Sequence, residues 1–208
     1  MGFFQNHYRI EPSRLSNWDY STPGYYFVTI CTQDHACLFG EISNGKIRLN
    51  DLGHSASDCI NQIPTHFLTA KIDEHIIMPN HVHAIIQLCD VNAAKIRHKR
   101  DVACYVSTKI KGPTADSKMA AISPKPQSLS TIVRSFKSET TKQIRSIDCQ
   151  IRHVWQPRFH DHIIRNDREL FAIRLYIRNN PTNWENDRNV IETSGIKTGK
   201  QPWFVYMG

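Results

Sequence analysis

The chain of 208 residues lacks any long hydrophobic run. Its apolar stretches are far shorter than the ~20 residues that a helix needs to span a bilayer, so we expect no membrane-spanning segment. Its first residues also lack the basic start, apolar centre and small-residue cleavage site of a secretory signal. We therefore expect a cytoplasmic protein with no membrane partner.

Cysteine pairs with metal-ligand spacing are missing as well. The six cysteines form no Cys-x-x-Cys motif and no spacing typical of a zinc ribbon. Reduced thiols that pack as small hydrophobic side chains explain them most simply. This pattern argues against a disulfide scaffold and against a cysteine-based zinc module.

Acidic residues are scarce relative to basic ones. There are 19 Asp and Glu against 26 Lys and Arg, which gives a net charge of +7 and a pI of about 9.2. The segment from Lys95 to Lys118 contains seven Lys and Arg residues but only two acidic residues, Asp101 and Asp116. This excess favours a polyanionic partner, because cationic side chains displace counterions from nucleic-acid phosphates. A solvated loop explains a charge run equally well, so both interpretations stay open.

The length and the hydrophobic fraction of 40% suit one domain with a sizeable core. Hydrophobic periodicity fades in a basic stretch from about 91 to 127, which we interpret as an insertion. A C-terminal tail begins at about 185. We predict a single domain over 1–208 that carries this insertion and this tail.

Several stretches have the composition of β-strands. Asn44-Gly45 separates two of them and is a strong hairpin signal. Short links between the strands predict antiparallel neighbours. The stretches are rich in β-branched and aromatic residues or alternate in polarity, and they lie at 25–32, 39–42, 46–49, 71–78, 81–88 and within 154–165.

Three helical patterns complete an α+β prediction. Asp51 can cap the first helix, and Pro64 is expected to end it. Ser128 can cap the second. Asn166, with a glutamate three residues later, predicts the start of a helix over 167–179.

The second helix is amphipathic. Its apolar residues recur at helical spacing and form one stripe for the core. Arg134 and Lys137 lie mostly off this stripe. We therefore expect its basic side to reach phosphates.

His81 and His83 occupy an alternating stretch with one valine between them. Side chains alternate across a strand, so both imidazoles are expected on the same face. That geometry suits a metal ion. Two strand histidines satisfied by hydrogen bonds are the other interpretation, and the motif alone does not decide between the two.

Tyr176 and Asn180 lie four residues apart on the third helix and hence on one side of it. A phenol can attack phosphorus when a divalent cation stabilises the developing negative charge. Two imidazoles and an amide oxygen suit magnesium or manganese, with positions left for water and phosphate. A tyrosine on an amphipathic helix is also an ordinary packing residue.

Five motifs in order resemble those of a known family. They are Tyr25-Tyr26-Phe27-Val28-Thr29-Ile30, Met78-Pro79-Asn80-His81-Val82-His83, Ser128-Leu129 through Phe136-Lys137-Ser138, Trp155-Gln156-Pro157-Arg158-Phe159 with Asp161-His162-Ile163-Ile164-Arg165, and Tyr176-Ile177-Arg178-Asn179-Asn180-Pro181. With them the chain resembles the single-tyrosine HUH transposases of insertion sequences, and most closely the REP-associated tyrosine transposases. Five ordered motifs are far more specific than an isolated His-x-His.

The resemblance implies a ferredoxin-like α+β fold, an antiparallel sheet with helices packed on it. It also implies a metal-dependent transposase that cleaves and transfers single-stranded DNA at hairpin-containing repeats. Tyr176 would be the nucleophile and would form a 5′-phosphotyrosine. His81, His83 and Asn180 would hold Mg²⁺ or Mn²⁺. The long basic insertion departs from many relatives.

Further positions are candidates for DNA contacts. They are Arg134, Lys137, Arg158, His162, Arg165, Lys95, Arg97, Lys99 and Arg100. For His162 we expect a structural or DNA-positioning role first, with a direct metal-ligand role as the alternative. Aromatic residues such as Trp155, Phe159 and Trp184 are either platforms for unpaired bases or core anchors.

Two rival functions follow from the same residues. A hairpin-binding regulator that no longer cuts would keep the fold without the chemistry. A metal-dependent hydrolase acting through bound water would stay active without the Tyr176 hydroxyl. The expected partner is single-stranded or hairpin DNA, and the protein is expected to be a monomer or a homodimer.

Overall fold

A four-stranded antiparallel sheet forms the centre of the protein in a computed structural model that describes residues 3–4, 7–8, 15, 18–90 and 125–184. Its spatial order is β6-β7-β3-β8. The bounds are Gly24–Cys31 for β3, Ala70–Met78 for β6, His81–Leu88 for β7 and His160–Ile164 for β8. Every neighbouring pair is antiparallel. Numbered along the chain, these strands have the order 4-1-3-2 of a ferredoxin-like unit, which confirms the predicted fold class.

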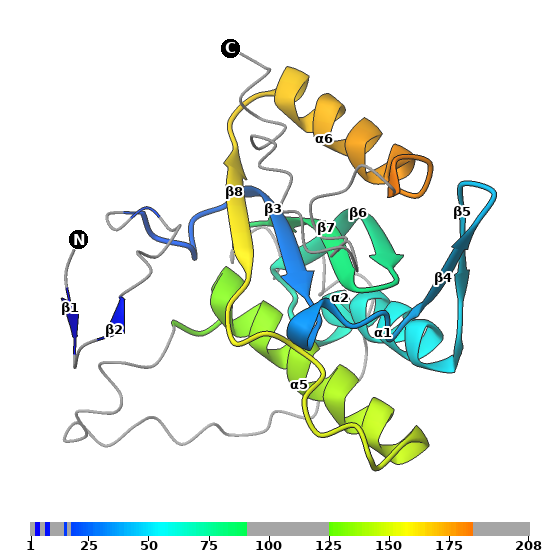
Figure 1. The fold of residues 1–208 in the computed structure, drawn as a ribbon. Coiled ribbons are helices and arrows are strands. Elements are labelled where there is room, and N and C mark those ends of the chain that lie inside the picture. Colours follow the sequence, from blue (N-terminus) through cyan, green and yellow to red (C-terminus); the bar gives the residue numbers. More distant parts are fainter. Residues whose placement is uncertain (1–2, 5–6, 9–14, 16–17, 91–124, 185–208) are drawn as a thin grey trace, which may run out of the picture.

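Three helices cover the two faces of this sheet. Helix α1 (Asp51–Asn61) and helix α5 (Leu129–Ile147) lie on one side, and α6 (Asp167–Asn179) lies on the other (Figure 1). Alternation along β3 supplies both cores. Tyr26 and its alternate neighbours pack against α1 and α5, whereas Phe27 packs against α6. The sheet therefore separates two hydrophobic layers.

The Asn44-Gly45 signal forms the hairpin predicted for it. Both residues have positive φ, 52° and 68°, as expected for the central pair of a type I′ turn. The turn joins β4 (Gly40–Ser43) to β5 (Lys46–Leu49). These two strands form a separate sheet rather than neighbours of the central strands. A second small sheet pairs β1 (Phe3–Phe4) with β2 (His7–Tyr8).

Two helix boundaries differ from the sequence prediction. Asn50, not Asp51, caps α1, because its side chain accepts a hydrogen bond from the Gly53 amide. Pro64 does not end this helix. It lies in the first turn of the short helix α2 (Ile63–His66), where a missing amide hydrogen costs nothing.

The strand predicted within 154–165 is shorter than expected. It begins at His160, and Trp155 forms only an isolated bridge with Thr32. A short 3-10 helix, η1 (Gln33–His35), follows β3. Most of the predicted insertion, and the whole predicted tail, lie outside the described residues.

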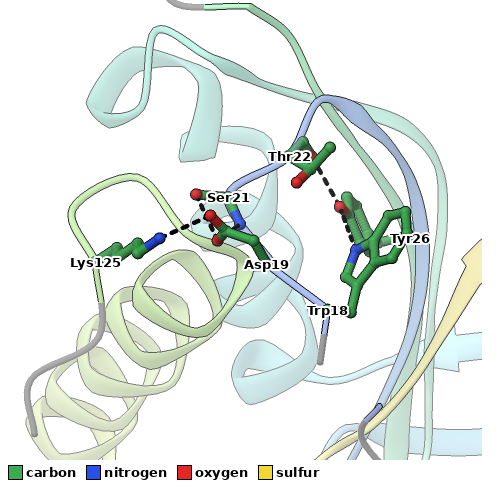
Figure 2. A network of polar contacts seen from close by, with 6 residues as sticks. All are labelled: Trp18, Asp19, Ser21, Thr22, Tyr26 and Lys125. Carbon is green, nitrogen blue, oxygen red and sulfur yellow. Dashed lines mark hydrogen bonds and ion pairs between the residues drawn. The ribbon is translucent and has the colours of Figure 1, made fainter. Parts of the chain in front are cut away.

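A polar network joins the residues before β3 to those before α5 (Figure 2). Lys125 donates a hydrogen bond of 2.7 Å to Asp19. This contact, with further hydrogen bonds, lowers the pKa of the Asp19 carboxyl to about 2. The Tyr26 hydroxyl donates to the Thr22 carbonyl and accepts from the Trp18 indole. The network therefore fixes both flanks to the sheet.

Within the part of the chain that the structure describes, no helix is long and apolar enough to cross a membrane.

Candidate active site

His81 and His83 lie at the start of the central strand β7, on the face that α6 covers. They are 0% and 1% exposed. Their ring centroids are 4.4 Å apart. The alternation of the strand therefore places both imidazoles together, as the sequence predicted.

Each imidazole is oriented by a hydrogen bond at Nδ1. Asn80 Oδ1 lies 2.8 Å from His81 Nδ1, and Thr29 Oγ1 lies 2.9 Å from His83 Nδ1. An amide oxygen only accepts, so His81 carries its proton on Nδ1 and turns the Nε2 lone pair outward. The two Nε2 atoms then converge at 3.0 Å.

Tyr176 reaches the same point from α6. Its hydroxyl lies 3.2 Å from His83 Nε2. The edge of the phenol ring contacts Phe27 of β3, with centroids 6.0 Å apart and planes at 85°. A phenol hydroxyl and two imidazole nitrogens thus meet at one place between the helix and the sheet.

Apolar packing and ion pairs hold α6 in this position. Ile173 and Ile177 are fully buried against the sheet. Arg174 forms a bidentate pair with Asp73 of β6, at 2.6 and 2.8 Å. One turn later, Arg178 pairs with another β6 carboxylate. The orientation of the Tyr176 side chain is therefore set by contacts on both sides of its helix.

Asn180 caps the C-terminal end of α6 and is 2% exposed. It follows Tyr176 by one turn. Trp184 comes one turn further on, and its ring stacks on His81 with centroids 6.1 Å apart and planes at 18°. Asn180 thus lies in the chain between two residues that contact the histidine pair. The stacking of Trp184 on His81 was not predicted, because no local pattern signals it.

The two imidazole Nε2 atoms converge at 3.0 Å, so they could act together as ligands of one divalent cation. Across the described residues there is no group of three or more His, Cys, Asp or Glu able to hold a metal. An ion here would add neutral oxygen ligands, such as that of Asn180, and water to the two imidazoles.

His162 is bound to α6. Its Nε2 lies 2.5 Å from Glu169 in the first turn of the helix. Burial opposes the ionisation of Glu169, but hydrogen bonds from the Arg165 amide and from His162 outweigh it and lower the carboxyl pKa. These contacts support the structural role that we expected first for His162.

Apart from His162, the predicted DNA-binding residues fall in three places. Arg134, Lys137 and Arg158 line an open groove beside α5, across the sheet from Tyr176. Arg165 is exposed at the end of β8. The other four lie outside the described residues: Lys95, Arg97, Lys99 and Arg100. The structure changes the interpretation of Lys137, whose ammonium donates to backbone carbonyls of the chain itself.

No family model matches the chain. The structure is similar to that of a REP-associated tyrosine transposase bound to a REP hairpin, with a TM-score of 0.48, 19% identity and coverage of 88% of this chain and 74% of the other. It is also similar to a Deinococcus radiodurans R1 protein assigned provisionally as a transposase, with a TM-score of 0.39, 12% identity and coverage of 76% and 91%. An uncharacterized protein of Haemophilus influenzae (strain Rd) is 35% identical over 179 residues, 86% of this chain and 92% of its own length. With this identity over nearly the full length of both proteins, the chain belongs to the same family as the Haemophilus influenzae protein.

Proposed function

We propose that the protein is a transposase-like enzyme that cleaves single-stranded DNA and transfers the strand through a phosphotyrosine intermediate. The observation that carries this proposal is the meeting of the Tyr176 hydroxyl with the Nε2 atoms of His81 and His83. The five sequence motifs support it, and the basic net charge suits a nucleic-acid substrate.

The hydrogen bonds of the histidines are compatible with a cation that both imidazoles share. Asn80 leaves the His81 Nε2 as a lone pair, and Thr29 can do the same for His83 by accepting from Nδ1. Two lone pairs facing at 3.0 Å repel each other unless a proton or a metal ion lies between them. We propose Mg²⁺ or Mn²⁺, held by His81, His83 and Asn180. When bound, it would withdraw negative charge from the phosphate oxygens and the leaving oxygen.

The residues of the chain then have distinct tasks. Tyr176 forms a bond from its oxygen to phosphorus as the phosphorus–O3′ bond breaks. The hydroxyl proton passes to solvent, and the departing 3′-oxygen takes a proton to become a free 3′-hydroxyl. The resulting 5′-phosphotyrosine keeps the energy of the broken bond for rejoining. Phe27 and the α6 ion pairs hold the phenol ring, so little reorganisation is needed before attack.

The decisive experiment is the trapping of the covalent intermediate. The protein is incubated with end-labelled, hairpin-containing single-stranded DNA and Mn²⁺ or Mg²⁺, then separated under denaturing conditions. A labelled protein–DNA adduct that is stable to denaturant is expected. DNA binding without adduct at any metal concentration would instead favour a hairpin-binding regulator.

Two further assignments stay predictions. They are the cytoplasmic location and the state of the protein as a monomer or a homodimer.

A further inference from the structure

Thr29 lies directly beside His83 in the sheet. The two residues are register partners on β3 and β7, so their side chains are on the same face. Thr29 is 1% exposed, and its hydroxyl oxygen lies 2.9 Å from His83 Nδ1. The pairing of two central strands therefore holds this hydroxyl against the imidazole.

The hydrogen-bond partners of the two imidazoles differ in what they offer. The Asn80 amide oxygen accepts hydrogen bonds and does not donate them, so it fixes the proton of His81 on Nδ1. A threonine hydroxyl both donates and accepts. The hydroxyl of Thr29 is therefore compatible with a proton on either ring nitrogen of His83.

The contact between the two imidazoles selects one tautomer of His83. His81 presents a lone pair at Nε2, and His83 Nε2 lies 3.0 Å from it. This distance suits a hydrogen bond in which His83 carries its proton on Nε2. The Thr29 hydroxyl then donates a hydrogen bond to the lone pair at His83 Nδ1. We call this tautomer the Nε2–H form of His83.

In the Nε2–H form, three buried hydrogen bonds have a common direction. Thr29 donates to His83 and His83 donates to His81. His81 in turn donates to Asn80. Each lone pair along this chain faces a proton, and hydrogen bonds in such a chain strengthen one another.

A cation held by both imidazoles requires the opposite tautomer of His83. An imidazole ligand offers a lone pair, so His83 Nε2 has to give up its proton. This proton goes to solvent and Nδ1 takes up another, which leaves the ring neutral. The Thr29 hydroxyl then turns and accepts a hydrogen bond from Nδ1. We call this tautomer the Nδ1–H form.

The packing around His83 favours a relocated proton over a rotated ring. The centroid of the imidazole lies 5.2 Å from that of Phe27 and 5.2 Å from that of Tyr176. His83 is 1% exposed, and close packing of this kind opposes the rotation of a ring. Rotation of a hydroxyl hydrogen needs no extra space. The Thr29 hydroxyl is therefore the group that reorients.

The two tautomers present different groups to Tyr176. The phenol oxygen lies 3.2 Å from His83 Nε2. In the Nε2–H form this oxygen faces an imidazole proton, which engages one of its lone pairs. In the Nδ1–H form that proton has left Nε2, so the lone pair of the phenol oxygen is released. The tautomer of His83 thus changes the surroundings of the Tyr176 hydroxyl.

We infer that Thr29 is a positioning residue of the candidate active site, which reverses its hydrogen bond so that His83 changes from the Nε2–H form to the Nδ1–H form when a divalent cation binds. The Nε2–H form follows from the geometry of the hydrogen bonds. The Nδ1–H form rests on the proposed function, in which His83 is a ligand of the cation.

The test reads the tautomers by nitrogen NMR on the full-length protein with isotopically labelled histidine. Ring nitrogens that carry a proton and ring nitrogens with a lone pair have separate chemical shifts. Spectra are recorded at about pH 8.5, where an ordinary imidazole is neutral, first in chelator and then in saturating Mg²⁺. The chain contains 11 histidines, and the signals lost in His81→Ala and His83→Ala identify the pair.

Three substitutions separate the hydroxyl from the packing of the side chain. Thr29→Val nearly keeps the shape and removes the hydroxyl, whereas Thr29→Ser keeps the hydroxyl. The matched control is Thr140→Val. Thr140 is 0% exposed, and its hydroxyl donates to a carbonyl within α5, on the opposite side of the sheet. Mn²⁺ affinity is measured by calorimetry for each protein, and thermal melting monitors the fold.

In chelator, the wild-type protein is expected to show His83 in the Nε2–H form, and Mg²⁺ should convert it to the Nδ1–H form. In Thr29→Val the Nδ1–H form has a buried donor that has lost its acceptor, so His83 should resist this conversion. The Mn²⁺ affinity of this variant should fall by about 10- to 100-fold. Thr29→Ser should bind Mn²⁺ as the wild type does, and Thr140→Val should change neither measurement.

A proton on Nδ1 of His83 in chelator would overturn the inference, and this result does not depend on the folding of any variant. The inference would also fail if saturating Mg²⁺ left His83 in the Nε2–H form, or if Thr29→Val and Thr29→Ser had equal Mn²⁺ affinities. The adduct assay is a separate measurement. The expected tautomers in a protein that never forms an adduct would support the role of Thr29 and reject the proposed cleavage. An adduct from a protein whose His83 keeps its proton on Nδ1 throughout would do the reverse.

Discussion

The Tyr176 hydroxyl lies 3.2 Å from Nε2 of His83, although 93 positions separate the two residues in the chain. Buried apolar contacts hold the helix of Tyr176 against the sheet, and ion pairs join this helix to β6, the strand next to the one that carries His83. The Tyr176 hydroxyl and the imidazoles are therefore oriented before any substrate arrives. Such preorganisation is what a displacement at phosphorus requires.

Tyr176→Phe should abolish the covalent DNA adduct while DNA binding and folding persist. The substitution keeps the ring that contacts Phe27 and removes only the hydroxyl that we propose as the nucleophile. Adduct yield on a denaturing gel and DNA affinity by fluorescence anisotropy measure the two effects separately.

Tyr25→Phe is the matched control, because Tyr25 packs in the same cluster but pairs with Gln87. That register position is four residues from His83, or about 13 Å along the strand. The control should form adduct normally. Strand cleavage that survives Tyr176→Phe would instead support hydrolysis by a bound water.

Local patterns were sufficient to predict part of the site. Period-two alternation placed His81 and His83 on one face, and the Asn166 cap predicted where α6 begins. Both depend on residues close together in the chain. Helix caps and strand alternation follow from local backbone geometry, so the residue patterns that produce them can be recognised in a single sequence.

The remainder of the site depends on tertiary packing. No spacing indicates that Trp184 stacks on His81 or that Arg174 reaches Asp73, since both contacts join distant segments. The contacts of the Lys137 side chain also depend on tertiary packing. Its position off the apolar stripe predicted phosphate contact, whereas its ammonium binds the carbonyls of a loop that folds back onto α5.

His81→Ala or His83→Ala should lower cleavage by at least about 100-fold, and chelation of divalent ions should have the same effect. Each substitution removes one of two imidazole donors. Asn180→Ala should cost less, because water can replace a neutral oxygen. Adduct rate and Mn²⁺ binding by calorimetry are the measurements.

His54→Ala on the exposed side of α1 is the control for loss of a histidine. It should leave both Mn²⁺ binding and the adduct rate unchanged. Since His81 and His83 are buried, thermal melting separates unfolding from loss of the ion. Full activity in excess chelator would eliminate the metal from the proposal.

Arg174→Met should reduce the adduct rate several-fold by loosening α6. The bidentate pair with Asp73 is partly shielded from solvent, and a double-mutant cycle with Asp73→Asn should give a coupling of about 1 kcal/mol in the free energy of unfolding. Arg168→Met, exposed on the same helix, is the control. A coupling near zero would show that the Arg174–Asp73 pair contributes little to the position of α6.

The last prediction concerns Lys137 and alkaline pH. Burial lowers the pKa of its ammonium from 10.5 to about 8. Between these values the unfolded chain holds more protons at this side chain than the folded chain does. The contribution of Lys137 to the free energy of unfolding should therefore rise with pH across this window.

Lys137→Met removes this titration, so the stability of the wild-type protein relative to the variant should increase between about pH 7.5 and pH 10 by about 1 kcal/mol. This expected change in the free energy of unfolding is small because the carbonyls of Gln156 and Arg158 favour the protonated ammonium and because the Lys137 side chain is partly exposed. Urea unfolding at both pH values measures the difference, and other groups cancel because both proteins contain them. Lys142→Met, at an exposed position of the same helix, should show no such increase. Identical pH dependence for wild type and Lys137→Met would mean that the carbonyls of Gln156 and Arg158 offset the effect of burial on the pKa of the Lys137 ammonium.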